Sequence, residues 1–209
     1  MYFHKMPKVI QKFHPNYTWH KSRERKVLYI TFDDGPIPEV TDFALEALNQ
    51  FDAKATFFCV GDNVQKYRKQ FKAIVEKGHV IANHTFNHMN GWETDANEYI
   101  KNISDCEKII GDVTKSYTQK MFRPPYGRIK KRQYELLKAD YEVIMWDVLT
   151  GDFDRDLDKE KCLEESIQAT NNGSIIVFHD SIKAKENMMY ALPRFLAHFS
   201  QLGYTFEAL

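Results

Sequence analysis

The sequence contains few cysteines. Only Cys59, Cys106 and Cys162 occur among 209 residues, an odd number with wide spacing. Proteins that rely on disulfides in oxidising compartments carry denser, paired sets. We therefore expect no disulfide framework, we interpret Cys59 and Cys106 as core residues, and we favour a reducing compartment.

Long apolar runs are also missing. The first 26 residues hold no continuous apolar stretch of signal-peptide length, and no segment approaches the roughly 20 residues of a membrane span. Together with the cysteine pattern, this favours a cytoplasmic location and no transmembrane segment. Export of a longer precursor and peripheral association with a membrane are the alternatives.

Net charge is absent as well. Lys plus Arg and Asp plus Glu each number 29, so the balance gives no indication of a nucleic-acid partner. Apolar residues make up 43% of the chain, which is enough for one sizeable core. We assign this single domain to residues 27–209, and nothing in the sequence indicates an oligomeric state.

Residues 1–26 form a locally basic segment, in which Glu24 is the only acidic residue. We predict that this segment is an arm that docks onto the domain. The alternative is contact with an anionic membrane surface through its apolar residues Phe3, Ile10, Phe13 and Trp19. Pro7 and Pro15 would interrupt any long amphipathic helix here.

Short apolar segments alternate with segments of helical periodicity along the rest of the chain. Apolar runs predict strands at 27–32, 55–60, 80–82, 121–122, 142–146, 174–178 and 204–206. Apolar spacing predicts helices at about 39–51, 62–77, 95–110, 130–139, 158–171 and 188–199. Asp62 with Gln65, and Asp95 with Glu98, resemble capping boxes. This alternation is typical of an α/β fold with a parallel sheet, either doubly wound or closed as a barrel.

Polar residues follow several of these predicted strands. Because right-handed crossovers place the carboxyl ends of parallel strands on one side of a sheet, the residues that follow them should gather there. These residues are Asp33-Asp34, His84 with His88, Arg123 with Tyr126, Asp152, and His179. We read the remainder of the acidic segment 147–158 as a solvated loop that caps the next helix.

Asp33 and Asp34 directly follow a buried strand, where two carboxylates need compensation by a cation or an arginine. His84 and His88 are four residues apart, so on a helical turn both would point the same way. Two imidazoles and one carboxylate are a pattern typical of a catalytic metal site. The simpler alternatives are a helix cap for the acids and ordinary surface or core positions for the histidines.

The segment Arg123-Pro-Pro-Tyr126-Gly127 is either a rigid turn or a means of holding Arg123 beside one of the acids. His179 is either a structural residue at a strand end or a proton donor that titrates near neutral pH.

Taken together, these segments resemble the motifs of the polysaccharide deacetylases, carbohydrate esterase family 4, which share the NodB homology domain. The resemblance covers roughly residues 27–207. The matching segments are Thr31-Phe-Asp-Asp-Gly-Pro36, His84-Thr-Phe-Asn-His88, Arg123-Pro-Pro-Tyr-Gly127 and Val177-Phe-His-Asp180. They occur in the order that the family has.

One motif departs from the family pattern W-x-x-D-x-x-D-W. After Trp146, Leu149 replaces the first acid, Asp152 keeps the second, and Phe153 replaces the final tryptophan. The change affects the expected wall of the substrate groove more than the chemistry.

The resemblance implies a distorted (β/α) barrel, often with seven strands, and it implies roles for particular residues. Asp34, His84 and His88 would hold a divalent metal, Zn²⁺ or a substitute such as Co²⁺. Asp33 would be the general base beside Arg123, and His179 the general acid oriented by Asp152. The backbone N–H of Tyr126 would bind the oxyanion.

The implied activity is removal of N-acetyl groups from glycans that contain N-acetylglucosamine, of the peptidoglycan or chitooligosaccharide (chitin) type. Two other hypotheses stay open. The chain could be an O-acetyl xylan esterase or small-amide hydrolase of the same superfamily, or a metal-containing module that binds glycans without cleaving them.

Overall fold

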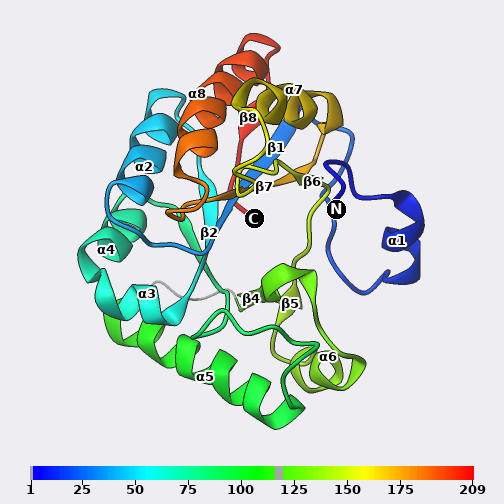
Figure 1. The fold of residues 1–209 in the computed structure, drawn as a ribbon, viewed down its shortest axis with the longest axis vertical. Coiled ribbons are helices and arrows are strands. Elements are labelled where there is room, and N and C mark those ends of the chain that lie inside the picture. Colours follow the sequence, from blue (N-terminus) through cyan, green and yellow to red (C-terminus); the bar gives the residue numbers. More distant parts are fainter. Residues whose placement is uncertain (1, 116–119) are drawn as a thin grey trace.

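The computed structural model describes residues 2–115 and 120–209, in which strands and helices alternate (Figure 1). The strands are β1 Val27–Asp33, β2 Ala55–Cys59, β3 Val80–Asn83, β4 Met121–Phe122, β5 Glu142–Val143, β6 Val148–Leu149, β7 Ile175–His179 and β8 Thr205–Phe206. The helices are α1 Lys8–Phe13, α2 Val40–Gln50, α3 Gly61–Lys66, α4 Arg68–Glu76, α5 Ala96–Val113, α6 Lys131–Leu137, α7 Lys159–Ala169 and α8 Lys185–Gln201. A single turn of 3₁₀ helix, η1, spans Pro125–Gly127.

Seven parallel strands form a continuous sheet in the order β5-β4-β3-β2-β1-β7-β6, and β8 pairs with the start of β1. The sheet curls into a half-barrel, and the helices form a layer around it: α7 and α8 at the top of Figure 1, α2 and α4 at the left, and α5 at the bottom. The α/β class and the distorted barrel predicted from the sequence are therefore confirmed.

The central strand β1 is covered on both faces, as expected for a parallel strand inside such a sheet, and six of its seven residues are buried. Leu28, Ile30 and Phe32 are fully buried. The ring of Phe32 stacks on Phe57 of β2 with centroids 4.8 Å apart, and it also contacts Phe178 of β7 at 6.1 Å. This packing fixes β1 between its neighbours, so the residues at its carboxyl end are held in place.

The acidic segment 147–158 differs in part from the solvated, helix-capping loop that the sequence predicted, although Asp158 does cap α7. Val148 and Leu149 form β6, which pairs with Ile176 and Val177 of β7. Asp147 is fully buried. The sequence pattern was misleading because the two apolar residues of β6 lie between acids, and only pairing with β7 makes them a strand.

The predicted helix over 62–77 is two helices. The chain breaks at Tyr67, where φ is −119° and ψ is 51°, between α3 and α4. The predicted capping box at Asp62 is also wrong, because α3 begins after Val60 without a side-chain cap, and Asp62 instead pairs with Lys66. Asp95 does cap α5, since its carboxylate accepts a hydrogen bond from the N–H of Asn97.

Residues 2–26 contact the domain at both edges of the sheet, near β6 and near β5, with α1 beside the N-terminus at the right of Figure 1. The Met6 N–H donates to the carbonyl of Asp147, and the Thr18 N–H donates to the carbonyl of Val143. Of the helices within residues 2–115 and 120–209, none combines the length and the apolar character needed to cross a bilayer.

The carboxylate of Asp147 joins this segment to the domain. Its Oδ2 atom accepts hydrogen bonds from Lys5 Nζ at 2.7 Å, Arg23 Nη2 at 2.9 Å and Ser174 Oγ at 2.5 Å. Burial alone would raise the pKa of Asp147, but the hydrogen bonds from Lys5 and Ser174 lower it below its ordinary value. The ionised form of Asp147 therefore stabilises the folded chain.

We predict that Asp147→Ala lowers the free energy of unfolding by about 1–3 kcal/mol at pH 7, because hydrogen bonds to a charged group are lost and two cations lose their partner. Since the pKa of Asp147 is lower in the folded state, this stabilisation is full above the unfolded value of about 3.9 and is lost as the pH falls further. Urea denaturation at pH 7 and at pH 3 measures both effects. Asp105→Ala, which removes a surface pair with Lys101, is the control and should cost under about 1 kcal/mol.

Candidate active site

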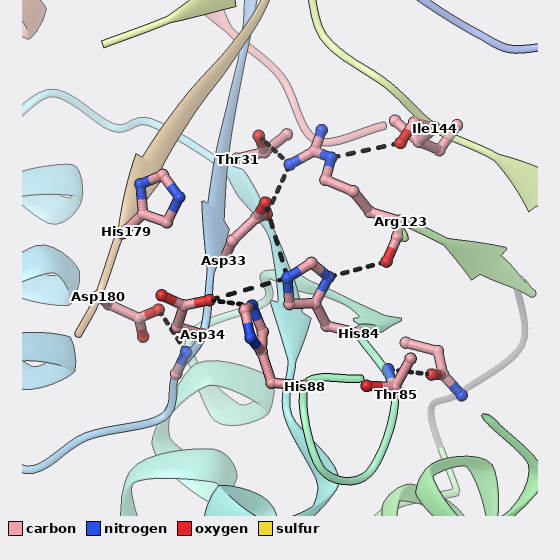
Figure 2. Close-up of polar contacts among 12 residues, drawn as sticks. Thr31, Asp33, Asp34, His84, Thr85, His88, Arg123, Ile144, His179 and Asp180 are labelled. Atoms are coloured by element: carbon pink, nitrogen blue, oxygen red, sulfur yellow. Dashed lines mark hydrogen bonds and ion pairs between the residues drawn. The ribbon is translucent and has the colours of Figure 1, made fainter. Parts of the chain in front are cut away.

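The polar residues that the sequence places after β1, β3, β4 and β7 meet at one edge of the sheet (Figure 2). Asp33 ends β1 and lies in register with His179 at the end of β7. His84 follows β3, and Arg123 follows β4. In this view His179 and Arg123 lie on opposite sides of the pair Asp33 and Asp34.

Asp33 and Asp34 are neighbours in sequence, yet their carboxylates face different partners. The reason is the backbone of Asp34, whose φ of 80° lies in the left-handed region that non-glycine residues seldom adopt. The Asp34 carbonyl accepts a hydrogen bond from Asn63 Nδ2 at 2.7 Å, which holds this conformation. The alternative that the two acids cap the next helix is wrong, because the N-cap of α2 is Glu39.

Asp180 supports the same turn, and the sequence analysis missed it. Its buried carboxylate accepts hydrogen bonds from the Gly35 N–H at 2.9 Å and from Thr41 Oγ1 at 2.6 Å. A Cβ atom at Gly35 would lie only 1.9 Å from Asp180 Oδ2, so the turn requires glycine. Burial, with the nearby charge of Asp34, raises the pKa of Asp180 to about 7 against the hydrogen bond from Thr41. The sequence signal was its place in the segment Val177-Phe-His-Asp180, where no role was assigned to it.

Asp34, His84 and His88 present one ligand atom each within 4.8 Å of one another. The Oδ1 atom of Asp34 lies 3.1 Å from His88 Nε2 and 3.7 Å from His84 Nε2. Two imidazole nitrogens and a carboxylate oxygen are donors that suit Zn²⁺ and similar divalent ions. The structure therefore brings together the three residues that the sequence analysis assigned to a metal.

The second ring nitrogen of His84 shows that this donor set fits a metal. His84 Nδ1 lies 2.8 Å from the carbonyl oxygen of Arg123 and donates its proton there, which leaves the Nε2 lone pair facing Asp34. Burial lowers the pKa of His84 to about 4, against the attraction of Asp33, so the ring is neutral at physiological pH. A neutral, oriented imidazole is the form that binds metals.

The two histidines do not converge by the predicted helical turn. Residues 84–88 form an irregular loop in which Thr85 and His88 have φ values of 64° and 54°. The side chain of Asn83 accepts a hydrogen bond from the Thr85 N–H, and Asn102 of α5 accepts two from Phe86 and Asn87. Buried amide side chains thus shape the loop, and the four-residue spacing alone did not reveal them.

Asp33 is paired with Arg123, a side chain with no exposed surface. Arg123 Nη1 donates to Asp33 Oδ1 at 2.6 Å and to Thr31 Oγ1 at 2.8 Å, and Nη2 donates to the Met145 carbonyl at 3.0 Å. The guanidinium also stacks 4.0 Å above the ring of Phe58. Asp33 Oδ1 is therefore fixed, while Oδ2 faces His84 Nε2 at 4.0 Å.

His179 is paired with Asp152, which binds it twice. Asp152 Oδ1 lies 2.8 Å from His179 Nδ1, and Asp152 Oδ2 accepts the His179 backbone N–H at 2.7 Å. Burial alone would lower the pKa of His179, but Asp152 raises it to about 9, with Asp34 and Asp33 adding to the effect. The imidazole is therefore protonated at neutral pH. The ring of Phe153 contacts it edge-on at 5.1 Å.

Tyr126 lies in η1 with a φ of 60°, and its ring packs against His88 with centroids 4.7 Å apart. The structure thus brings this residue beside the cluster of Asp34, His84 and His88. The use of its backbone N–H for an oxyanion stays a prediction.

A sequence model described as polysaccharide deacetylase matches residues 20–144. A peptidoglycan-N-acetylglucosamine deacetylase of Bacillus cereus is 32% identical and aligns over 90% of this chain and 89% of its own length. A chitooligosaccharide deacetylase of Azorhizobium caulinodans is 31% identical, with 81% of this chain and 80% of its own length aligned. Some other curated relatives are longer, and the chain spans as little as 32% of one of them.

Among solved structures, the Bc1960 peptidoglycan N-acetylglucosamine deacetylase superimposes with a TM-score of 0.89 at 28% identity, covering 98% of this chain and 95% of that one. A pseudoenzyme of carbohydrate esterase family 4 from Bacillus anthracis has a TM-score of 0.83 at 22% identity and covers 91% of this chain and 66% of that one. The second likeness concerns the fold alone.

We predict that His84→Ala and His88→Ala each abolish stoichiometric binding of Zn²⁺, because two protein ligands hold a catalytic metal far less well than three. Titration calorimetry with Zn²⁺ on the metal-free protein measures this. His20→Ala, an exposed histidine remote from the cluster, should bind zinc as the unaltered chain does. Full zinc occupancy in either ligand variant would refute the assignment.

We predict that Asp152→Asn lowers the pKa of His179 from about 9, because burial is then opposed only by the charges of Asp34 and Asp33. NMR titration of the imidazole in the metal-free protein measures the change. Asp140→Asn, an exposed acid on the turn after α6, should leave that pKa unchanged. An unchanged pKa in Asp152→Asn would show that the pair does not control the protonation of His179.

Proposed function

The chain belongs to the polysaccharide deacetylase family, and on that premise we propose that it is a metal-dependent amide hydrolase that removes the acetyl group from N-acetylglucosamine units of a glycan. One observation carries the proposal. A donor set that fits a divalent metal, Asp34 with His84 and His88, lies beside a carboxylate fixed by an arginine and near a protonated histidine fixed by a carboxylate.

Hydrolysis of an amide presents three difficulties, which are a weak nucleophile, a weak electrophile and a poor leaving group. A divalent ion held by Asp34, His84 and His88 supplies Lewis-acid polarisation and makes water more acidic when it is bound. We propose Zn²⁺, with Co²⁺ as a substitute. The remaining steps belong to the side chains around this cluster.

Asp33 is the proposed general base. Arg123 donates a hydrogen bond to Asp33 Oδ1 and neutralises part of the carboxylate charge. The Oδ2 atom of Asp33 therefore remains available to take a proton from the attacking water. The same pairing keeps the carboxylate in one orientation within a buried environment. The base is therefore oriented before substrate arrives, which reduces the reorganisation needed during the reaction.

His179 is the proposed general acid. Its pKa of about 9 means that it carries a proton at pH 7 and can deliver it to the nitrogen of the departing amine. Asp152 holds Nδ1, so the proton on Nε2 is the one that is transferred. The products are acetate and a free amino sugar. The Tyr126 backbone N–H would bind the oxyanion, and one such donor is typically worth about 2.7–4 kcal/mol.

The names of two relatives, a peptidoglycan-N-acetylglucosamine deacetylase and a chitooligosaccharide deacetylase, support the proposed substrate class. An O-acetyl xylan esterase or small-amide hydrolase would use the same residues and is the first alternative. A module that binds glycans without cleaving them is the second. A proposed base, Asp33, and a proposed acid, His179, are each held by a partner side chain. This favours an enzyme, because a module that only binds glycans needs neither a base nor an acid.

We predict that the metal-loaded chain releases acetate from N-acetylglucosamine oligomers or peptidoglycan faster than from acetylated xylan. Asp33→Asn should keep stoichiometric metal and lower kcat by about 10²–10⁴-fold, the usual contribution of a general base. Asp140→Asn is the matched control, with kcat unchanged. Glycan binding without acetate release in a metal-loaded sample would refute the proposal, and so would wild-type turnover by Asp33→Asn.

A further inference from the structure

All three tryptophans of the chain line a single groove. Trp19, Trp92 and Trp146 come from the basic N-terminal segment, from the loop after His88 and from the segment between β5 and β6, yet they bound one cavity of about 250 Å³. Ile10 of α1 and Tyr126 of η1 also line this cavity. We call this cavity the tryptophan groove.

The groove begins next to the candidate metal cluster. Tyr126 belongs to its wall, and the Tyr126 ring also packs on His88 with centroids 4.7 Å apart. Gly127 also lines it, and a Cβ atom there would lie 2.7 Å from Trp146 Cη2. The Trp146 ring therefore lies directly on the backbone of η1, which joins the groove to the reaction centre.

Two of the aromatic side chains on the groove are unusually exposed. Trp92 is 59% exposed and Tyr126 is 62% exposed, whereas most large apolar side chains of the domain are buried. The guanidinium of Arg128 lies 5.1 Å from the Trp92 ring and 5.9 Å from the Tyr126 ring, which holds both in place. Exposed aromatic surface next to a reaction centre indicates a ligand more often than it indicates packing.

The chemistry of the wall selects the kind of ligand. Among the described residues that line the groove, none is Asp, Glu, Lys or Arg, and His14 is the one basic side chain on a wall that is otherwise aromatic and apolar. Flat aromatic faces suit the C–H face of a neutral pyranose ring, whose hydroxyls stay near the rim. The volume lies just below the roughly 300 Å³ at which pockets for drug-sized ligands begin, and this suits one sugar unit.

We propose that the tryptophan groove is a glycan subsite that holds a neutral pyranose ring next to the N-acetylglucosamine unit being deacetylated. This inference rests on the proposed function, because the ring must belong to the chain whose acetyl group is at the metal cluster. α1 and Trp19 then contribute to substrate binding although they precede residue 20, where the family match begins. The enzyme should prefer oligosaccharides to the single sugar.

The three tryptophans also provide the measurement. Because every tryptophan lines the groove, tryptophan fluorescence, excited selectively over tyrosine, reports on this cavity. Titration of the metal-free protein with tetra-N-acetylchitotetraose should shift the emission, while N-acetylglucosamine at equal concentration should shift it far less. This readout needs neither metal nor turnover.

Two pairs of variants separate the groove from the rest of α1 and its surroundings. Ile10→Trp fills the cavity. Val9→Trp places the same side chain at the preceding position of α1, where the native Val9 is 57% exposed and does not line the cavity. Trp92→Ala removes a wall, whereas Phe13→Ala removes an aromatic ring that is 78% exposed and lies outside the groove. Ile10→Trp and Trp92→Ala should weaken binding of the tetramer at least tenfold and raise its KM similarly with kcat nearly unchanged. The two controls should match the unaltered chain.

The outcomes distinguish the subsite from the function. A fluorescence shift with the tetramer that Ile10→Trp abolishes and Val9→Trp keeps supports the subsite, even if no acetate is released. No shift with the tetramer overturns the subsite, and so does an equal loss in a variant and its control. Acetate release at the same kcat/KM for the single sugar and the tetramer also overturns it, while leaving the deacetylase proposal intact.

Discussion

The buried contact between Arg123 and Asp33 is the interaction on which the rest of the site depends. The guanidinium neutralises Asp33 at the end of the central strand, so a carboxylate can be kept inside the half-barrel. The backbone carbonyl of the same arginine accepts the Nδ1 proton of His84 and so directs its other nitrogen toward Asp34. One residue thus positions both the proposed base and one proposed metal ligand.

Two adjacent carboxylates acquire different environments because the backbone turns between them. Asp33 is still in extended β1, while Asp34 has left-handed torsions, a carbonyl held by Asn63 and a following glycine held by Asp180. The pKa of Asp34, which burial alone would raise, is lowered by the hydrogen bond from His88 and by nearby imidazoles. Asp34 is thereby kept ionised where the metal ion is expected, while the neighbouring Asp33 faces Arg123.

Much of the fold was predictable from the sequence, and the failures have common causes. The long apolar run of β1 and the alternation of strands and helices indicate a parallel sheet without further information. The strand at Val148–Leu149 was missed because two residues carry no periodicity, and they form a strand only through β7. The break at Tyr67 was missed because the apolar spacing continues across it.

The sequence by itself determined which residues end the strands, and therefore that Asp33, His84, Arg123 and His179 share one edge of the sheet. Tertiary structure decided how they meet there. The loop at 84–88 takes its shape from Asn83 and Asn102, and the groove beside Tyr126 takes its tryptophans from three separate segments. The physical reason is that the position of each strand along the chain follows from local periodicity. The direction of a side chain depends instead on hydrogen bonds and packing between residues that are distant in the chain.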